Sequence, residues 1–483
     1  MPRTAPNLHL ALTLPESDLP LRHRVADALV SEIREGRLRP GDPLPSTRLL
    51  ATHLEVSRGA VVAAYDELAA AGYLAARGGA GTRVAPEADR AARAGVTSHV
   101  RPTATPRRDA SGPLPIPLRW DLRPGRPDPS LIDPVAWSRA WRAGARPTPV
   151  DNFSAGPPHA RLRRALAEHL RRSRGIPVDP QELLVVPGVA ATLHALTPAL
   201  GLAGRIVALE DPGYAEAWTA FEVAGARPRP IPVDDDGLDP ARLDGDVAAV
   251  YVTPAHQFPL GARMPVGRRA DLLAWAARTG GVIIEDDYDG EFRYDVSPLP
   301  ALRSLSGAAE HVVYVGTASK ILSPGLRVAW LLPPAHLREP MRVTLEQLGL
   351  AVNEVTGAAL AHFIESGALA AHHARAARTY AARRAAVVAA LGRHLPHLPL
   401  LGVDAGLHLV VGLGDGIDDA VDDLDLVGRL ADAGVGAAPL SAYCTAYPRS
   451  GVLLCYACLP ESQADAAVRA IAGVVGGIPC GHG

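Results

Sequence analysis

The chain has 483 residues, of which 48% are hydrophobic and 21% charged, and its net charge is −2. This length favours two to three domains, and this composition is typical of a globular protein with a large core. The small net charge excludes a uniformly basic nucleic-acid binder, so any contact with DNA has to come from a local patch. We find no charge-free apolar run of about 18 residues and no signal peptide, which predicts a cytoplasmic protein without a membrane span.

The N-terminal residues 21–85 contain three short helical patterns followed by a glycine-rich hairpin. The segment 21–36 should form a helix that ends at Gly36, and the patterns STRLLATHL and SRGAVVAAYDELAAAG should form two more, capped by Ser46 and Ser57. The run YLAARGGAGTRVA then predicts two short strands, a wing. The apolar positions that we assign to the core are Leu21, Val25, Ala28, Leu29 and Ile33 in the first helix, and Val61, Val62, Tyr65 and Leu68 in the third.

Two short helices joined by a tight turn are typical of a helix-turn-helix, although an ordinary three-helix packing unit has the same pattern. The start of the second of these helices can enter the major groove, where Arg58 could read guanine or hold a phosphate. The run LRPGDPLPSTRLLATHLEVSRGAVVAAYDELAAAGYLAARGGAGTRVA resembles the winged helix-turn-helix of the GntR family. That resemblance implies double-stranded operator DNA as a partner. It also implies DNA contacts from Arg48, Ser57, Arg58, Arg77 and Gly78, in a domain that spans residues 1–85.

Residues 86–119 have the composition of a linker, with several prolines, six arginines and three acidic residues, and no sustained apolar period. From about 120 to 370, apolar strand-like runs such as IVALEDPGY, VAAVYVTP, GVIIEDDYD and VVYVGTASK alternate with helical patterns. Alternation of this kind predicts an α/β domain with a mainly parallel sheet. Residues 371–483 open with an Ala/Arg-rich helix and end in short strands and a last helix, which indicates a smaller α+β subdomain.

Lys320 is the single lysine among 49 basic residues. A guanidinium stays protonated, whereas a lysine amine can lose its proton and form an imine. The residues around it suit a pyridinium cofactor, which needs a carboxylate at the ring nitrogen, a hydroxyl near the ring oxygen and donors for a phosphate. Asp286 ends an apolar strand, so we assign it to the ring nitrogen. We assign Tyr288 to the ring oxygen, and Thr317, Ser319 and Arg327 to the phosphate, with an effector carboxylate as an alternative ligand for Arg327.

Residues 120–475 resemble fold-type I aminotransferases, and more specifically the aminotransferase-like domain of MocR-type GntR regulators. The matching phrases are LEDPGYAEAW, VDDDGLD, VYVTPAHQFPLGARMP, EDDYDGEFRYD, PLPAL, GTASKILSPGLR and PLSAYC. The resemblance implies pyridoxal 5′-phosphate as cofactor, Lys320 as its Schiff-base lysine, Tyr214 stacked on the ring and His256 near the ring oxygen. Gly188, Val189 and Ala190 should offer backbone N–H groups to the phosphate at a helix start.

Three features depart from the family pattern. The turn GVAAT lacks polar side chains, Phe153 stands where a tyrosine is common, and GVLLCYACL lacks the arginine that grips a substrate carboxylate. The pair Cys455 and Cys458 in this run favours buried thiols in a strand over redox or metal chemistry, and we expect no metal site. With only four cysteines, the chain has no disulfide framework.

These observations favour a transcription regulator whose DNA binding responds to pyridoxal phosphate or to its adduct with an effector, a small amine or amino acid. The resemblance implies a homodimer, and a two-fold dimer would read paired half-sites. Two alternatives stay open. One is a working aminotransferase with an appended DNA-binding module, and the other is a DNA-binding protein whose second domain is an inert scaffold.

Overall fold

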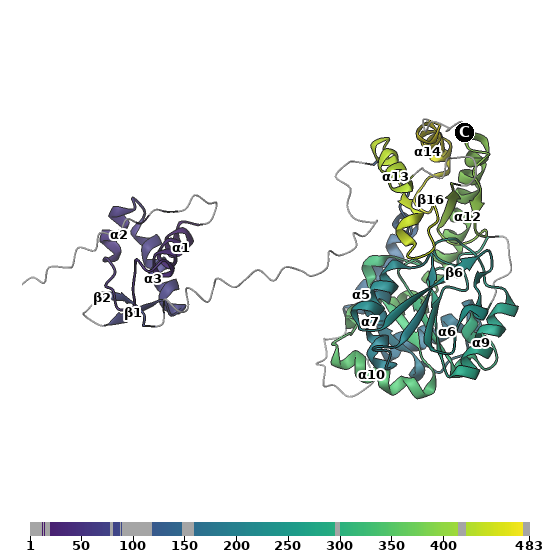
Figure 1. Ribbon diagram of the computed structural model, residues 1–483, viewed down its shortest axis with the longest axis horizontal. Helices are drawn as coiled ribbons and strands as arrows, with labels where there is room; N and C mark the ends of the chain where they lie inside the picture. Colours follow the sequence, from purple (N-terminus) through teal and green to yellow (C-terminus); the bar gives the residue numbers. More distant parts are fainter. Residues whose placement is uncertain are drawn as a thin grey trace, which may run out of the picture. The chain divides into compact units, whose positions relative to one another are not determined.

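The computed structural model describes residues 12, 14, 20–77, 81–86, 88, 118–146, 159–294, 300–413 and 422–476. The chain divides into two compact units, residues 1–107 and 108–483, which Figure 1 draws in purple and in teal to yellow. Each unit has a core of its own. No helix in the described ranges is both long and apolar enough to cross a membrane.

The first unit has three helices and a two-stranded wing. The elements are α1 (Leu21–Arg34), α2 (Thr47–His53), α3 (Arg58–Ala70), β1 (Leu74–Arg77) and β2 (Gly81–Val84), with the two strands antiparallel. The hydroxyl oxygens of Ser46 and Ser57 accept hydrogen bonds from the backbone N–H groups of Leu49, at 3.2 Å, and Ala60, at 3.3 Å. Both predicted N-caps are therefore confirmed, and they fix where α2 and α3 begin.

The predicted core of this unit is correct except at its margins. Val25, Leu29, Ile33, Val61 and Leu68 are buried together. Leu21 is only half-buried. The prediction that Val62 is buried is wrong, since its side chain is 37% exposed. Val61 faces α1, and the next side chain along a helix points about 100° away from Val61.

The second unit is built on an eight-stranded sheet in the order β4-β11-β10-β9-β8-β5-β6-β7. The five central strands β10, β9, β8, β5 and β6 are parallel, which confirms the mainly parallel sheet, while β4, β11 and β7 each run antiparallel to a neighbour. The strands are β4 (Leu184–Val186), β5 (Ile206–Asp211), β6 (Arg227–Asp234), β7 (Gly237–Leu238), β8 (Val247–Val252), β9 (Val282–Asp287), β10 (Val312–Thr317) and β11 (Ala329–Leu332).

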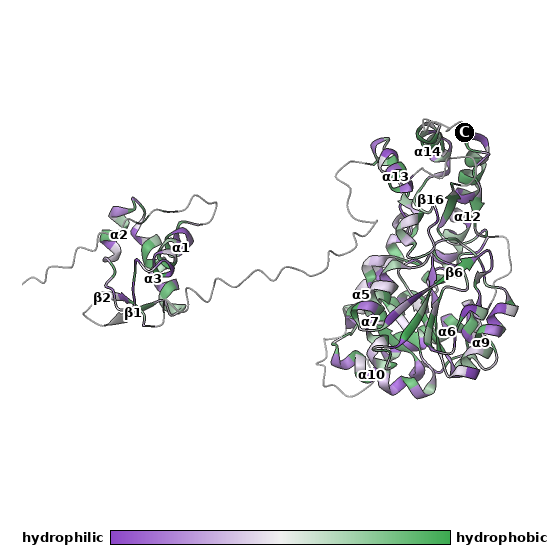
Figure 2. Ribbon diagram, viewed as in Figure 1, coloured by the Kyte–Doolittle hydropathy of each residue, from purple (hydrophilic) through white to green (hydrophobic). Residues whose placement is uncertain are grey.

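Helices cover both faces of this sheet. Along β5, Val207 and Leu209 pack into one apolar cluster with α7 (Val189–Ala199), α8 (Ala215–Val223) and α10 (Arg338–Gln347), while Ala208 packs into another with α9 (Val266–Thr279). A third cluster joins α5 (Pro134–Gly144), α6 (Ala160–Ser173) and α11 (Glu354–Glu365). Figure 2 shows several central strands in green, whereas the outer helices α9 and α10 carry both colours, as expected for elements with one solvated face.

A smaller subdomain follows in the chain. It contains α12 (Ala368–His394), α13 (Asp423–Asp432) and α14 (Glu461–Val475), and a sheet of β12 (Leu400–Leu401), β13 (His408–Gly412), β16 (Gly451–Cys455) and β15 (Ala438–Pro439) in that order. The segment around residue 120 belongs here, although we expected it to open the large domain. The strand β3 (Trp120–Asp121) pairs with β14 (Val435–Gly436), and Trp120 and Leu122 lie in the subdomain's apolar core.

Candidate functional site

A cavity of about 330 Å³ opens at the carboxyl ends of the parallel strands, where α/β sheets bind ligands. It brings together residues far apart in the sequence, from the loop at 124–126 to the small subdomain's Leu407 and His408. Every residue that we assigned to the cofactor from the sequence lines it, with the exception of His256. These are Gly188, Val189, Ala190, Tyr214, Asp286, Tyr288, Thr317, Ser319, Lys320 and Arg327.

Lys320 lies just after β10, and its ammonium group donates a hydrogen bond to the backbone carbonyl of Gly125 at 3.1 Å. Burial lowers the pKa of this amine, because the charged form loses its hydration. A Cβ atom at Gly125, where φ is +94°, would come within 3.1 Å of the Lys320 Nζ atom, so this position needs glycine. A lysine held in this way is closer to the neutral, nucleophilic form than a surface lysine.

Asp286 lies next to the end of β9 with its carboxylate in the cavity wall. One carboxylate oxygen accepts a 2.5 Å hydrogen bond from the Tyr251 hydroxyl, and the other is buried without any partner among the described residues. Burial raises the pKa of this carboxyl to about 7, and the Lys320 charge only partly opposes that effect. An unpaired buried carboxylate oxygen is costly, so a ligand that brings a protonated nitrogen to this point would be bound favourably.

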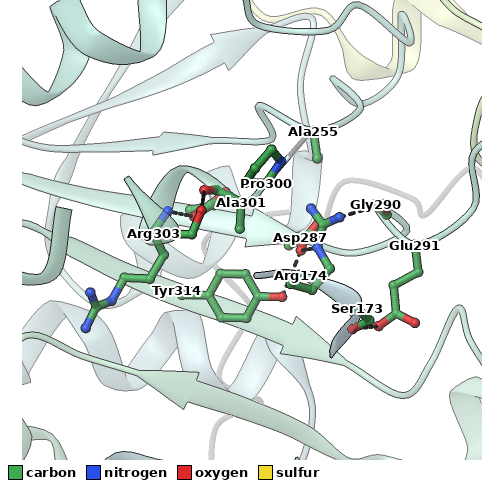
Figure 3. A network of polar contacts seen from close by, with 12 residues as sticks. Ser173, Arg174, Ala255, Asp287, Gly290, Glu291, Pro300, Ala301, Arg303 and Tyr314 are labelled. Carbon is green, nitrogen blue, oxygen red and sulfur yellow. Dashed lines mark hydrogen bonds and ion pairs between the residues drawn. The ribbon is translucent and has the colours of Figure 1, made fainter. Parts of the chain in front are cut away.

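The neighbouring Asp287 explains why Asp286 faces the cavity. Successive side chains of a strand point to opposite faces, and Asp287 is held on the far face by Arg174. Figure 3 shows this buried pair: the guanidinium binds both Asp287 oxygens, at 2.5 and 3.0 Å, and the Gly290 carbonyl at 2.9 Å. The Tyr314 hydroxyl adds a third donor to Asp287 at 2.8 Å. This network holds the end of β9 on the face of the sheet opposite Asp286.

The start of α7 forms the anion-binding end of the cavity. Gly188 precedes the helix with φ at +102°, and no side chain caps its first N–H groups. The Arg327 guanidinium lies against this turn: a Cβ atom placed on Gly188 would be 3.4 Å from the Cζ atom of Arg327. Nearby, the Thr317 hydroxyl donates to the Ser319 hydroxyl at 2.9 Å. Backbone N–H groups, a guanidinium and two hydroxyls on one wall are the groups that bind a phosphate.

His256 lies behind the cavity wall. Its side chain is 2% exposed, and its Nδ1 atom is 3.0 Å from both the Tyr288 hydroxyl and an Asp289 oxygen. Phe258, two residues later, lines the cavity, and its ring makes edge contacts with the rings of Tyr214 and Tyr288. His256 therefore lies one hydrogen bond behind Tyr288, the residue that we assign to the ring oxygen, and its own place near that oxygen stays a prediction.

Several lining residues were not assigned from the sequence. Tyr251 could have been found, because it lies near the end of a strand beside the one that carries Asp286. Gly125 and His408 carried no local signal, since both reach the cavity through contacts between distant segments. The other lining residues that we did not assign are Pro124, Arg126, Glu216, Thr253, Phe258, Asp289, Pro324, Leu407 and Tyr443.

The residues assigned to DNA lie on the first unit. Arg48 and Arg58 are exposed near the starts of α2 and α3, and neither makes an ion pair within the described part of the chain. The hydroxyl of Ser57 is used as the cap of α3. Arg77 ends β1, and Gly78 lies outside the described residues, as does Phe153.

The two cysteines of the C-x-x-C motif differ in exposure. Cys455 is buried at the end of β16, whereas Cys458 follows the strand and is exposed. The prediction of buried thiols in a strand is therefore correct for Cys455 and wrong for Cys458. Among the residues that the structure describes, no group of three or more His, Cys, Asp or Glu side chains is placed to hold a metal ion.

Comparison with solved structures agrees with this fold. An archaeal alanine:glyoxylate aminotransferase superposes with a TM-score of 0.69 at 22% identity, covering 75% of this chain and 91% of that one. The multiple substrate aminotransferase of Thermococcus profundus superposes with a TM-score of 0.66 at 25% identity, covering 74% and 91%.

Comparison of sequences covers both units. Residues 21–84 match the bacterial regulatory proteins of the gntR family, and residues 135–471 match the family of aminotransferases of class I and II. The chain is 36% identical over 411 residues to the HTH-type pyridoxine biosynthesis transcriptional regulator PdxR of Corynebacterium glutamicum, covering 85% of this chain and 86% of that protein. It is also 36% identical over 463 residues to the probable rhizopine catabolism regulatory protein MocR of Rhizobium meliloti, covering 92% and 91%. The chain therefore belongs to the MocR-type GntR transcriptional regulators, in which a helix-turn-helix module is joined to an aminotransferase-like domain.

Proposed function

We propose that this regulator binds pyridoxal 5′-phosphate through Lys320, and that the cofactor or its adduct with a small amine or amino acid changes the affinity of the N-terminal module for its operator. One observation carries the proposal. The chain's single lysine amine, half-buried, a buried carboxylate oxygen without a partner among the described residues and an uncapped helix start line the same cavity. The cofactor supplies an aldehyde for the amine, a ring nitrogen and a phosphate, and these three groups match the three features.

Different residues of the cavity would bind different parts of the cofactor. Asp286 would hold a proton at the ring nitrogen, since its raised pKa comes from burial and falls again beside a cation. The N–H groups after Gly188 and the Arg327 guanidinium would hold the phosphate. Tyr288, supported by His256, would donate to the ring oxygen. Desolvation would keep the Lys320 amine available for the aldehyde.

Regulation requires that the ligand bind two arrangements of the protein with different affinity. We propose a homodimer acting in the cytoplasm, whose two-fold axis matches paired half-sites in the operator. The cavity supports a regulatory role over steady amino-acid turnover. Its lining arginines are Arg126, which pairs with Asp121, and Arg327 beside α7, and none comes from the segment 451–459.

The cofactor half is tested by absorbance and by chemical trapping. The purified chain with added pyridoxal phosphate should develop a visible band, and borohydride reduction should leave the mass of the reduced cofactor on the peptide that contains Lys320. Lys320→Ala should lose both signals. Arg161→Lys, which places a new amine on an exposed helix position, should not gain a visible band and serves as the control. A band that persists in Lys320→Ala overturns the assignment.

The DNA half is tested separately. Arg58→Ala should weaken binding of a selected operator duplex by about fivefold or more, since one base contact contributes about 1–3 kcal/mol, while cofactor uptake stays unchanged. Titration of the operator with and without cofactor then tests the coupling between the two. Equal affinity in both conditions, and with each amine added, would contradict control by the cofactor.

A further inference from the structure

An aliphatic side chain stands on the open face of the helix that the DNA-binding proposal places in the major groove. Val62 in α3 is 37% exposed, whereas Val61, Ala64, Tyr65 and Leu68 of the same helix are buried. No described residue of the first unit covers this exposed part of the side chain. An exposed valine also lowers helix propensity relative to alanine, because its β-branch loses rotamer freedom. Its place on this face, rather than its exposure alone, makes it available for a contact outside this unit.

The neighbours of Val62 narrow the kind of contact. Arg58 lies one helical turn before it on the same face and is exposed without an ion pair among the described residues. Between them, Gly59 has no side chain and Ala60 offers only a methyl group. The first turn and a half of α3 thus presents one cationic donor and one apolar surface.

Asp66 stands one turn further along the same face, and it is exposed. A carboxylate is repelled by phosphates, so it limits the part of α3 that can face DNA to the residues before it. The N-terminal end of α3, with Arg58 and the exposed Arg48 of α2 nearby in sequence, carries the positive charge that a duplex requires.

We propose that Val62 reads the 5-methyl group of a thymine in the major groove of the operator. Thymine is the base that presents a methyl group there, and apolar side chains contact it. One helical turn advances about 5.4 Å, against a rise of about 3.4 Å per base pair, so this thymine lies one or two base pairs from the base that Arg58 contacts. The inference rests on the proposed DNA binding and adds the chemistry by which one base is chosen.

The experiment uses the full-length chain and a duplex recovered from a random library by in vitro selection on that chain. Each thymine of the duplex is replaced in turn by deoxyuridine, which removes only the methyl group. For wild type, one replacement in each half-site should weaken binding about fourfold, the effect of about 0.8 kcal/mol for one buried carbon. For Val62→Ala, the same replacement should have no effect, because the contact is already lost.

Two further variants keep the result interpretable. Val62→Thr keeps one methyl group and should retain part of the sensitivity. Val266→Ala makes the same truncation at an exposed position of α9 and should behave like wild type. Because Val62 lies outside the core of the unit and alanine has the higher helix propensity, Val62→Ala should not lower the thermal unfolding temperature of the first unit.

Three outcomes would overturn the inference. In the first, wild type binds the duplex with no sensitivity to any methyl group. In the second, Val62→Ala keeps the same sensitivity as wild type. In the third, Val62→Ala alters the oligomeric state and leaves DNA affinity unchanged, which would make Val62 a protein contact. If selection on the wild-type chain recovers no duplex at all, the proposed DNA binding fails as well, and that result is distinct from the other three.

Discussion

The carboxyl group of Asp286 leads to a prediction whose sign changes when the cofactor binds. The change is Asp286→Asn, which keeps the size of the side chain. In the cofactor-free protein, burial raises the pKa of this carboxyl from 3.8 to about 7. The protonated form is therefore favoured by folding. Its contribution to stability is complete below pH 4 and is lost as the pH rises toward 7, because the ionised group is then held in a dry site.

The size of the effect follows from the same values. A rise from 3.8 to about 7 corresponds to roughly 4 kcal/mol at about 1.4 kcal/mol per pH unit. Asparagine avoids this loss, but its amide N–H group takes the place of an oxygen without a partner, which costs about 1–3 kcal/mol. At pH 8 the cofactor-free variant should therefore be more stable than wild type by about 1–3 kcal/mol. At pH 5 the advantage should disappear or reverse.

Urea unfolding followed by tryptophan fluorescence measures this difference. All six tryptophans lie at residue 120 or later, so the signal reports only on the second unit. Saturating pyridoxal phosphate should reverse the order at pH 8, since it stabilises wild type by mass action and binds the variant poorly. The buried Glu285, whose pKa is also raised to about 7 by burial, titrates in both proteins and cancels in the comparison. The pKa of Glu210 is raised to about 7 by burial and in part by the Asp286 charge, so it should be lower in the variant. Equal differences in stability at pH 5 and pH 8 would refute the reasoning.

Two further predictions concern stability. Arg174→Met should lower the free energy of unfolding of the second unit by about 3–5 kcal/mol, because it leaves the buried Asp287 without its counter-ion. Arg161→Met, whose partner Glu365 is solvent-exposed, should lower it by less than about 1 kcal/mol. Urea unfolding of both variants measures the two losses, and losses of similar size would contradict the prediction. Ser57→Ala removes the cap of α3 and should cost about 1 kcal/mol, which speeds amide hydrogen exchange in the first turn of α3 about fivefold. Ser46→Ala should speed exchange in α2 instead, and unchanged exchange at Ala60 would show that the cap contributes nothing.

Much of the fold could be predicted because its signals are local. To predict Ser46 and Ser57 as N-caps, it was enough that each hydroxyl residue directly precedes a helical pattern. The alternation of apolar runs and helices in residues 120–370 predicted the parallel sheet. Asp286 and Lys320 follow apolar strands, and parallel strands bring their carboxyl ends to one edge, so their meeting in one cavity also followed from the sequence.

The features that we missed depend on contacts between distant segments. Val61 and Val62 are both aliphatic and adjacent, and only the position of α1 decides which of them is covered. The two-residue strand β3 is too short for any period, and it joins a partner more than 300 residues away. The hydrogen-bond distances from His256 to Tyr288 and Asp289 could not be predicted either, because they join segments more than 30 residues apart.

The adjacent carboxylates of β9 restrict how this strand can vary in evolution. A deletion of one residue before Asp286 would bring Asp287 to the cavity-facing position and Tyr288 to the position opposite Arg174, which would leave the buried guanidinium without its carboxylate. Such length changes are therefore selected against by folding alone, before any ligand is involved. In descendants that abandon the cofactor, we expect the aspartate on the Arg174 side to persist after its cavity-facing neighbour has been replaced.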